Sequence, residues 1–356
     1  MKNVVKESRI DELYYIRIIA TILVVAGHSA FYTILSGDGG IDYVTLMNES
    51  GIKDTIIHKG YLMVTNLIYS CHMHLFFFLS GIVYMACVKN GKYKEFKPFL
   101  SNKFIRLIVP YIVASILYGI PVLWFSGYFG NEDLVKKILQ GYLLGYGKNH
   151  LWYLVSLFQI FLLTWCLDYF LKSKYIKLLF ALLMLLSTHF KNIEFLYIYK
   201  TQAFFFYFFI GVLFEDYRKQ YSNYIIKRRL FFTTIFGLLW IVSFACNYYL
   251  IQNSIAGIAV SLFGILFFYN FSILLLNNIN PKNAIANVIN RYSFEIYIFA
   301  TPLNYAVLMT IYKLFGISIF GNENFSLILI IIRFLIQMFI PIVFGYVIQK
   351  IKSFFL

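Results

Sequence analysis

The chain has 356 residues, of which 60% are hydrophobic, 21% aromatic and only 13% charged. So few charges among so many apolar residues exclude an ordinary soluble domain, and the recurring apolar runs predict an all-α, polytopic integral membrane protein. The net charge of +15 comes from lysines and arginines between those runs. This distribution is a topology signal, and nothing in it predicts binding to nucleic acid.

About ten membrane-spanning helices are predicted from the apolar runs. In chain order they cover about residues 13–35, 61–87, 104–125, 151–171, 176–190, 201–215, 230–250, 255–276, 292–314 and 326–349. Residues 134–147 are too short to span and are expected to be interfacial or re-entrant. Most of the 31 lysines and arginines fall on the side of the N-terminus, as in 89–106, 172–177 and 218–229. The positive-inside rule then places both termini in the cytoplasm.

The spans leave no room for a separate soluble domain. The longest piece between confident spans, 36–60, has about 25 residues, too few for an independent domain, so residues 1–356 are predicted to form one transmembrane domain. The four cysteines have neither CxxC spacing nor a paired histidine cluster, so we expect neither disulfides nor a metal site.

The first span contains two ionisable residues, Arg17 and His28. Eleven helical positions make three turns plus about 20°, so both side chains share one face, roughly 16 Å apart along the axis. Buried ionisable groups in membranes are costly and usually face a protein interior or a polar cavity. The spacing therefore favours a polar track into the membrane. Two other interpretations remain: Arg17 reaches back to the headgroups, or His28 is a structural hydrogen-bond partner.

The second span carries His72, His74 and the pair Ser80-Gly81. His72 is expected near the midplane, and it points about 200° away from His74, so at most one of them shares a site with His28. A Ser-Gly pair in an apolar helix usually marks close helix packing. Alternatively, the small side chains leave space for a slender ligand against the backbone.

Further polar residues lie near span ends. Lys103 and Arg106 are three apart on the opening turn of the third span, and they fit either anionic lipid headgroups or a phosphate clamp. Arg333 is about 10 Å below the outer end of the last span, where it either reaches outward or lines the outer half of the same cavity. Asp168 and Glu295 are expected to be interfacial ion-pair partners.

Taken in order, these motifs resemble the acyltransferase-3 integral membrane family over about residues 12–347. The resemblance rests on Arg17-x10-His28, Phe77-Phe-Leu-Ser80-Gly81, Lys103-x-x-Arg106 with Pro110-Tyr111, His150-Leu-Trp152-Tyr-Leu, Phe205-Phe-Tyr-Phe-Phe-Ile-Gly211 and Ser293-Phe-Glu-Ile-Tyr297. Two positions depart from it. Many members have His-Pro where this chain has Ala300-Thr301-Pro302, and His74 stands where a proline is common.

The resemblance implies transfer of an acyl group, usually acetyl from cytoplasmic acetyl-CoA, to a sugar hydroxyl at the outer face. His28 matches the family's essential histidine, and Arg17, Lys103 and Arg106 match basic residues thought to act on the CoA end. Ser80 and Gly81 would then lie along the donor's path. Further substrate contacts are predicted for His72, Trp152 and Arg333.

The sequence thus predicts an acetyl-CoA-dependent O-acetyltransferase in the bacterial plasma membrane. Its acceptor would be a capsular, exopolysaccharide or other cell-envelope glycan, free or lipid-linked. His28 would take the hydroxyl proton, and an acetyl-histidine relay is the open variant. Two other classes remain. One is a transporter or flippase of an acyl or glycan-lipid substrate, which would ignore acetyl-CoA. The other is a purely structural helical subunit, which poorly explains a buried His28.

Overall fold

The structure is a bundle of apolar helices, as the composition predicts. The computed structural model describes residues 11–35, 40–129, 133–146, 150–190, 193–278 and 283–355. Six of the lysines and arginines to which the positive-inside rule was applied lie outside them: Lys2, Lys6, Arg9 and Lys282, expected on the inner side, and Lys148 and Lys191, expected on the outer side. The helices are α1 (Asp11–Ala30), α2 (Tyr43–Glu49), α3 (Ile56–Tyr69), α4 (His72–Lys89), α5 (Phe96–Lys103), α6 (Val109–Ala114), α7 (Ile120–Phe125), α8 (Leu134–Ile138), α9 (Trp152–Phe170), α10 (Lys174–Ser187), α11 (Ile198–Ile226), α12 (Arg229–Cys246), α13 (Ser254–Asn278), α14 (Ala284–Arg291), α15 (Ser293–Phe315) and α16 (Glu323–Phe355).

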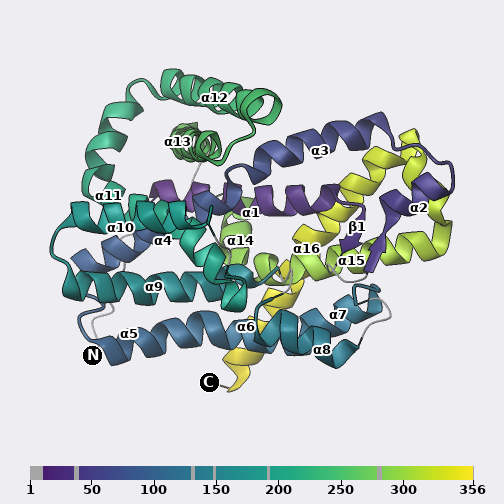
Figure 1. Cartoon of the computed structure of the whole chain (residues 1–356), viewed down its shortest axis with the longest axis horizontal. Helices are drawn as coiled ribbons and strands as arrows, with labels where there is room; N and C mark the ends of the chain where they lie inside the picture. Colours follow the sequence, from purple (N-terminus) through teal and green to yellow (C-terminus); the bar gives the residue numbers. More distant parts are fainter. Residues whose placement is uncertain are drawn as a thin grey trace.

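Within the described residues, nine helical segments are long and apolar enough to cross a membrane. They are Glu12–Ala30, Ile56–Lys89, Phe96–Phe125, Trp152–Phe170, Phe195–Ile226, Arg229–Ile251, Ser254–Leu276, Ser293–Phe315 and Glu323–Ile351. Several of them, including α1 and α9, run along the long axis of the molecule (Figure 1). A short antiparallel hairpin of β1 (Thr33–Leu35) and β2 (Gly40–Asp42) follows α1. The predicted class, a helical polytopic membrane protein, is confirmed.

The remaining predicted span, 176–190, corresponds to α10. Its 14 residues extend about 21 Å, less than a typical hydrocarbon core. Near the start of α10, Lys177 Nζ lies 2.5 Å from Asp168 on α9. The chain just before α11 meets α9 at Gln159, whose Nε2 donates to Leu196 O at 2.9 Å. Gln159 is about 14 Å further from the inner end of α9 than Asp168. From the Lys177 contact to the Leu196 contact, α10 and the segment after it therefore run about 14 Å along α9, away from its inner end.

Ion pairs gather the inner ends of several helices. Arg218 on α11 pairs with Glu215 at 2.5 Å and with Glu12 at the start of α1 at 3.3 Å. Lys89, at the end of α4, pairs with Asp216 at 3.0 Å. The beginning of α1 and the far parts of α4 and α11 therefore lie at one level. This is the end of the bundle where the positive-inside rule places the cytoplasm.

The opposite end of the bundle is assembled from the start of α3, the start of α16 and the hairpin (Figure 1, right). Thr55 Oγ1 and Ser326 Oγ are 2.8 Å apart, and the amide of Ile56 donates to Glu323 Oε1 at 2.7 Å. Side-chain caps thus join two helices that begin together at this outer end.

The second predicted span is broken into α3 and α4 by a turn at Ser70 and Cys71. Ser261 Oγ on α13 donates to Ser70 O at 2.8 Å, satisfying a carbonyl at the break. A Cβ added to Gly264 would lie 2.5 Å from Cys71 Cβ, so this glycine lets α13 approach the turn closely.

The third span begins at Phe96, earlier than predicted, and contains two π-helical turns, Phe104–Ile108 and Ser115–Gly119. Each turn directly precedes a helical piece with a proline in its first turn, Pro110 or Pro121. Proline has no N–H and clashes with the carbonyl four residues back, and a wider turn relieves that conflict.

Residues Leu134–Ile138 and Leu139–Leu143 form a short helical segment, which is too short to span, as predicted. It packs on α6, where the hydroxyl of Tyr111 donates to Tyr142 O at 2.5 Å.

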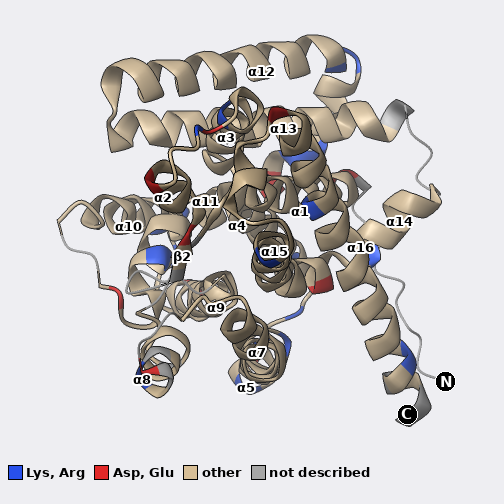
Figure 2. Cartoon of the chain, turned by 90° about the vertical axis from the view of Figure 1, so that its right-hand side faces the viewer, with Lys and Arg blue, Asp and Glu red and all other residues tan. Residues whose placement is uncertain are grey.

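Helix α1 occupies the interior of the bundle. It contacts α3, α4, α13, α14, α15 and α16, and it lies near the middle of the molecule seen from the outer end (Figure 2). Side chains that remain accessible on α1 therefore face space between helices.

Candidate functional site

The two ionisable residues of α1 keep accessible surface within an otherwise buried stretch. Arg17 is exposed although Ile16 and Ile18 are only 0% and 7% exposed. His28 is partly exposed, whereas Ser29 beside it is fully buried. Because α1 is surrounded by helices, both residues face the interior of the bundle, as the shared helix face predicts.

Arg17 lies near a hydrogen-bonded pair formed by α4 and α9. Tyr153 on α9 interacts electrostatically with Arg17. The Tyr153 hydroxyl is 3.0 Å from Ser80 Oγ. Ser80 donates to Phe76 O at 2.9 Å, so Tyr153 is the donor to Ser80. Among the described residues Arg17 has no hydrogen bond or ion pair, and its guanidinium is therefore available to a ligand.

The imidazole of His28 meets α3 and the start of α4. The Tyr69 hydroxyl is 3.3 Å from His28 Nδ1, and the Tyr69 ring stacks on His72 with centroids 4.6 Å apart. His74 instead packs against Phe204 and Tyr207. As expected, only one of the two α4 histidines belongs with His28, and it is His72.

A third histidine, His150, approaches His28 from the start of α9. Its Nε2 donates to Ile298 O at 2.9 Å, while the Tyr297 hydroxyl donates to His150 O at 2.7 Å. Ile298 O is open because Pro302, four residues on, has no N–H to offer. Burial lowers the pKa of His150 to about 4, and His28 is among its electrostatic neighbours. His150 is therefore neutral near pH 7, with Nδ1 as the acceptor.

Hydrogen bonds, ring contacts and two electrostatic interactions relate the two ionisable residues of α1. Arg17 interacts electrostatically with Tyr153, and the Tyr153 ring lies 5.6 Å from that of Tyr297. The Tyr297 hydroxyl donates to His150 O, and His150 interacts electrostatically with His28. All five side chains keep accessible surface. We call this series, from Arg17 through Tyr153, Tyr297 and His150 to His28, the polar track.

Lys103 and Arg106 lie closer to the inner end. Lys103 is only 8% exposed; its Nζ donates to the Tyr93 hydroxyl at 3.1 Å and lies 3.7 Å from the Phe161 ring centroid. Phe161 is about 12 Å inward of Tyr153 along α9, so Lys103 is nearer than Arg17 to the end of the bundle that the positive-inside rule assigns to the cytoplasm. Arg106 is exposed and has no ion pair among the described residues.

The structure gives the remaining predicted residues different surroundings. Gly81 is buried where α4 crosses α11, and a Cβ there would meet the carbonyl of Phe208. The packing interpretation therefore holds for Gly81, and Ser80 is the member of the pair beside the polar track. Trp152 packs on Phe77, and Lys200 Nζ lies 5.0 Å from its ring centroid.

Arg333 on α16 is fully buried and does not reach the membrane surface. Its Nε donates to Asn304 Oδ1 at 2.8 Å, and one terminal nitrogen donates to Phe31 O at 2.5 Å and to His28 O at 3.4 Å. Nε and one terminal nitrogen are thus occupied, whereas the other terminal nitrogen, Nη1, is buried without a hydrogen-bond partner among the described residues. Direct contact between Arg333 and a substrate stays a prediction.

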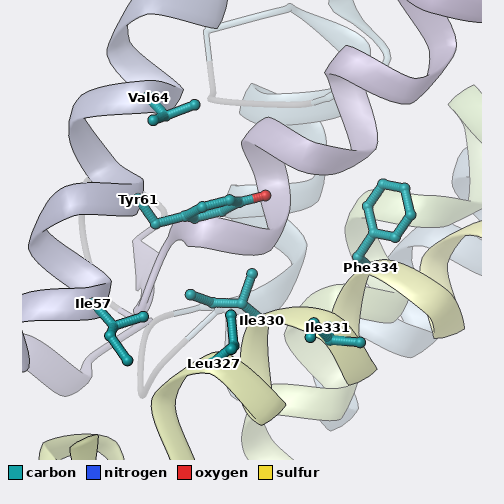
Figure 3. A pocket seen from close by; sticks show the side chains of 7 residues that line it. All are labelled: Ile57, Tyr61, Val64, Leu327, Ile330, Ile331 and Phe334. Atoms are coloured by element: carbon teal, nitrogen blue, oxygen red, sulfur yellow. The ribbon is translucent and has the colours of Figure 1, made fainter.

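An apolar pocket opens between α3 and α16 (Figure 3). It is lined by Ile57, Tyr61, Val64, Leu327, Ile330, Ile331 and Phe334. The one hydroxyl among these side chains, that of Tyr61, donates to Ala26 O at 2.9 Å. The pocket contains none of the predicted site residues, and its lining suits hydrocarbon better than a polar substrate.

The other predictions concern metals and ion pairs. Within the described part of the chain, no group of three or more His, Cys, Asp or Glu could hold a metal ion, and the four cysteines are free. Asp168 pairs with Lys177, as predicted. Glu295, by contrast, has no ion pair among the described residues.

Sequence reasoning assigned no role to several residues of this region: Tyr69, His150, Tyr153, Tyr297, Asn304 and Gln337. The family motifs did contain His150, Tyr153 and Tyr297. All are uncharged, and a search for intramembrane charges passes over them. For Gln337 a usable signal was present in its position, since it follows Arg333 by one helical turn and so shares its face.

Comparison with protein families finds a match to the acyltransferase-3 model, described as an acyltransferase domain, over residues 10–350. The matched range includes every residue of the polar track. No curated protein and no solved structure matches the chain.

Proposed function

This chain belongs to the acyltransferase-3 family and is a multi-pass membrane acyltransferase; on that premise we propose that it transfers an acetyl group from cytoplasmic acetyl-CoA to a hydroxyl of a cell-envelope glycan. The observation that carries the proposal is the polar track. It relates the guanidinium of Arg17, which is unpaired among the described residues, to an accessible imidazole, that of His28, inside an apolar bundle.

Donor binding is assigned to the inner cations. CoA carries a diphosphate and a further phosphate, which require arginine or lysine at a partly dry site. Arg106 is exposed near the inner end and Arg17 lies deeper, both without ion pairs among the described residues. Lys103, about one turn inward of Arg106 and enclosed by aromatic rings, adds positive potential to the same region. The pantetheine arm would extend outward past Ser80 and Tyr153.

His28 is assigned as the general base. Its imidazole takes the proton of the acceptor hydroxyl while the oxygen attacks the thioester carbonyl. A C–O bond forms, the C–S bond breaks, and the departing thiolate receives the proton, giving an acetyl ester and CoA thiol. In the two-step variant an imidazole nitrogen first carries the acetyl group and then passes it to the hydroxyl.

The acceptor is assigned to the outer side of a bacterial plasma membrane. His28 lies two residues before the end of α1, next to the hairpin that follows. A capsular, exopolysaccharide or lipid-linked sugar would therefore reach it from outside. Trp152 and His72, near the outer end of α9 and at the break in the second span, are the proposed sugar contacts.

The test measures CoA thiol release by the protein in proteoliposomes containing acetyl-CoA, with and without envelope glycan. We expect release that depends on the glycan and ester-linked acetate on the product. Arg106→Ala should raise KM for acetyl-CoA, whereas Lys97→Ala, which removes another exposed inner cation, should not. Glycan or lipid movement without acetyl-CoA consumption would instead identify a flippase.

A further inference from the structure

The end of α1, where His28 lies, is held by side chains of α15 and α16. The last four carbonyls of a helix have no partner within it. Here His28 O accepts from Asn304 Nδ2 at 3.0 Å, and Arg333 donates to both His28 O and Phe31 O. We propose that Asn304, Arg333 and Gln337, here called the α1 clamp, are positioning residues that fix His28 for acyl transfer. This inference rests on the proposed function.

Asn304 is the centre of the clamp. Its Nδ2 donates to His28 O, and its Oδ1 accepts from Arg333 Nε at 2.8 Å and from Gln337 Nε2 at 3.1 Å. The side chain is fully buried. Because two donors fix the oxygen, the amide can point only its N–H groups at α1.

Arg333 and Gln337 complete the clamp on either side. Arg333 is a fully buried cation without a carboxylate partner in the described part of the chain, a costly arrangement unless something compensates it. The carbonyls of His28 and Phe31, at and just beyond the negative end of the α1 dipole, supply part of that compensation, and Nη1 has no hydrogen-bond partner among the described residues. Gln337 Nε2 donates to Ser29 Oγ at 2.9 Å, and Ser29 in turn donates to Val25 O at 2.7 Å.

The clamp and Tyr69 hold His28 from two sides, one at its backbone and the other at its ring. A displacement of about 1 Å at a reacting group can cost roughly 100-fold in rate. A clamp that only stabilised the bundle would lose activity in proportion to folded protein. A clamp that positions His28 lowers kcat while donor binding, which involves other residues, is unchanged.

The decisive variant is Asn304→Asp. The carboxylate is nearly isosteric, still accepts from Arg333 and Gln337, and forms an ion pair with Arg333, but it cannot donate to His28 O. We expect the thermal unfolding temperature to hold or rise, kcat to fall about 100-fold, and KM for acetyl-CoA to stay unchanged. A fall in kcat without any loss of stability cannot come from a purely structural role.

Asn270→Ala is the matched control. Asn270 is equally buried, but its Nδ2 donates to the Tyr221 hydroxyl at 3.2 Å and to Leu266 O at 2.7 Å, away from His28. Its loss should reduce stability, as Asn304→Ala is also expected to do, while kcat per folded molecule is retained. A full kcat in Asn304→Asp would overturn the clamp.

Two further variants complete the design. If Asn304→Asp does not fold, Arg333→Lys, which keeps the charge but has fewer donors, takes its place. It should lower kcat at constant KM, and a full kcat would reject the proposal. His28→Ala distinguishes the clamp from the proposed function. Activity that survives in His28→Ala would overturn the proposed function itself. An inactive His28→Ala beside a fully active Asn304→Asp removes only the clamp.

Discussion

The contact between Tyr69 and His28 offers a sharp test of how the imidazole is oriented. For His28 Nε2 to accept a proton, Nδ1 must carry its own hydrogen, and the Tyr69 oxygen at 3.3 Å is its partner. Tyr69→Phe removes this oxygen alone. The ring that stacks on His72 at 4.6 Å stays, so packing changes little.

The size of the effect follows from the geometry. A typical hydrogen bond contributes about 0.5–1.5 kcal/mol net, and if all of that is lost in the transition state the rate falls roughly 2- to 13-fold. Since 3.3 Å lies at the long end of hydrogen-bond distances, we expect a loss in the lower half of that range. KM for acetyl-CoA should not change.

Initial rates of CoA thiol release in proteoliposomes measure this, with Tyr61→Phe as control. Tyr61 also joins α3 to α1, through a hydroxyl that donates to Ala26 O at 2.9 Å, but it does not touch the imidazole. It should lose similar stability and keep its kcat. Equal loss of kcat in both variants, or none in Tyr69→Phe, would refute the assigned orientation. A loss of several hundred-fold would mean that Tyr69 itself takes part in the chemistry.

Four other predictions follow from the same contacts. Arg106→Ala should raise KM for acetyl-CoA about 10-fold, the value of one weak charge-assisted hydrogen bond, in steady-state assays. Gly211→Ala, at the crossing of α11 with α4, should destabilise the protein by about 1–3 kcal/mol. Gly60→Ala, at a site where nothing lies within 4 Å of the added Cβ, should stabilise it slightly. Thermal unfolding in detergent measures both effects. His150→Ala alone should lower the free energy of unfolding by about 1 kcal/mol. In a background of Pro302→Ala, which supplies an N–H for Ile298 O, the same change should cost much less. Additive losses in this double-mutant cycle would disprove the link between Pro302 and the His150–Ile298 hydrogen bond. Because burial lowers the pKa of His150 from 6.5 to about 4, unfolding takes up a proton between these values, so stability falls as pH drops through this window; His150→Ala should flatten the decline, and an unaltered pH profile would contradict it.

Sequence periodicity predicted the features that depend on neighbouring residues. Hydropathy located the membrane helices, and helix geometry placed Arg17 and His28 on one interior face of α1. The same geometry predicted that at most one of His72 and His74 shares a site with His28. These features need no knowledge of other helices.

Features that depend on distant helices could not be predicted. The break at Ser70 is sustained by Ser261 and Gly264 on α13, far along the chain. The burial of Lys103 comes from rings on other segments, Phe161 among them. The sequence of the last span alone is compatible with an Arg333 that reaches outward and with one that lines a cavity. Its actual role depends on Asn304 and on the open carbonyls of α1.

The central claim is that acetyl passes through the bundle to an outer hydroxyl by way of His28. Sealed, oriented vesicles with acetyl-CoA only on the cytoplasmic side and acceptor glycan only on the outer side test it most directly. We expect ester-linked acetate on the glycan with the native protein, and none with His28→Ala at equal amounts of folded protein. Acetylation that persists in His28→Ala, or that requires acetyl-CoA on the acceptor's side, would contradict the account.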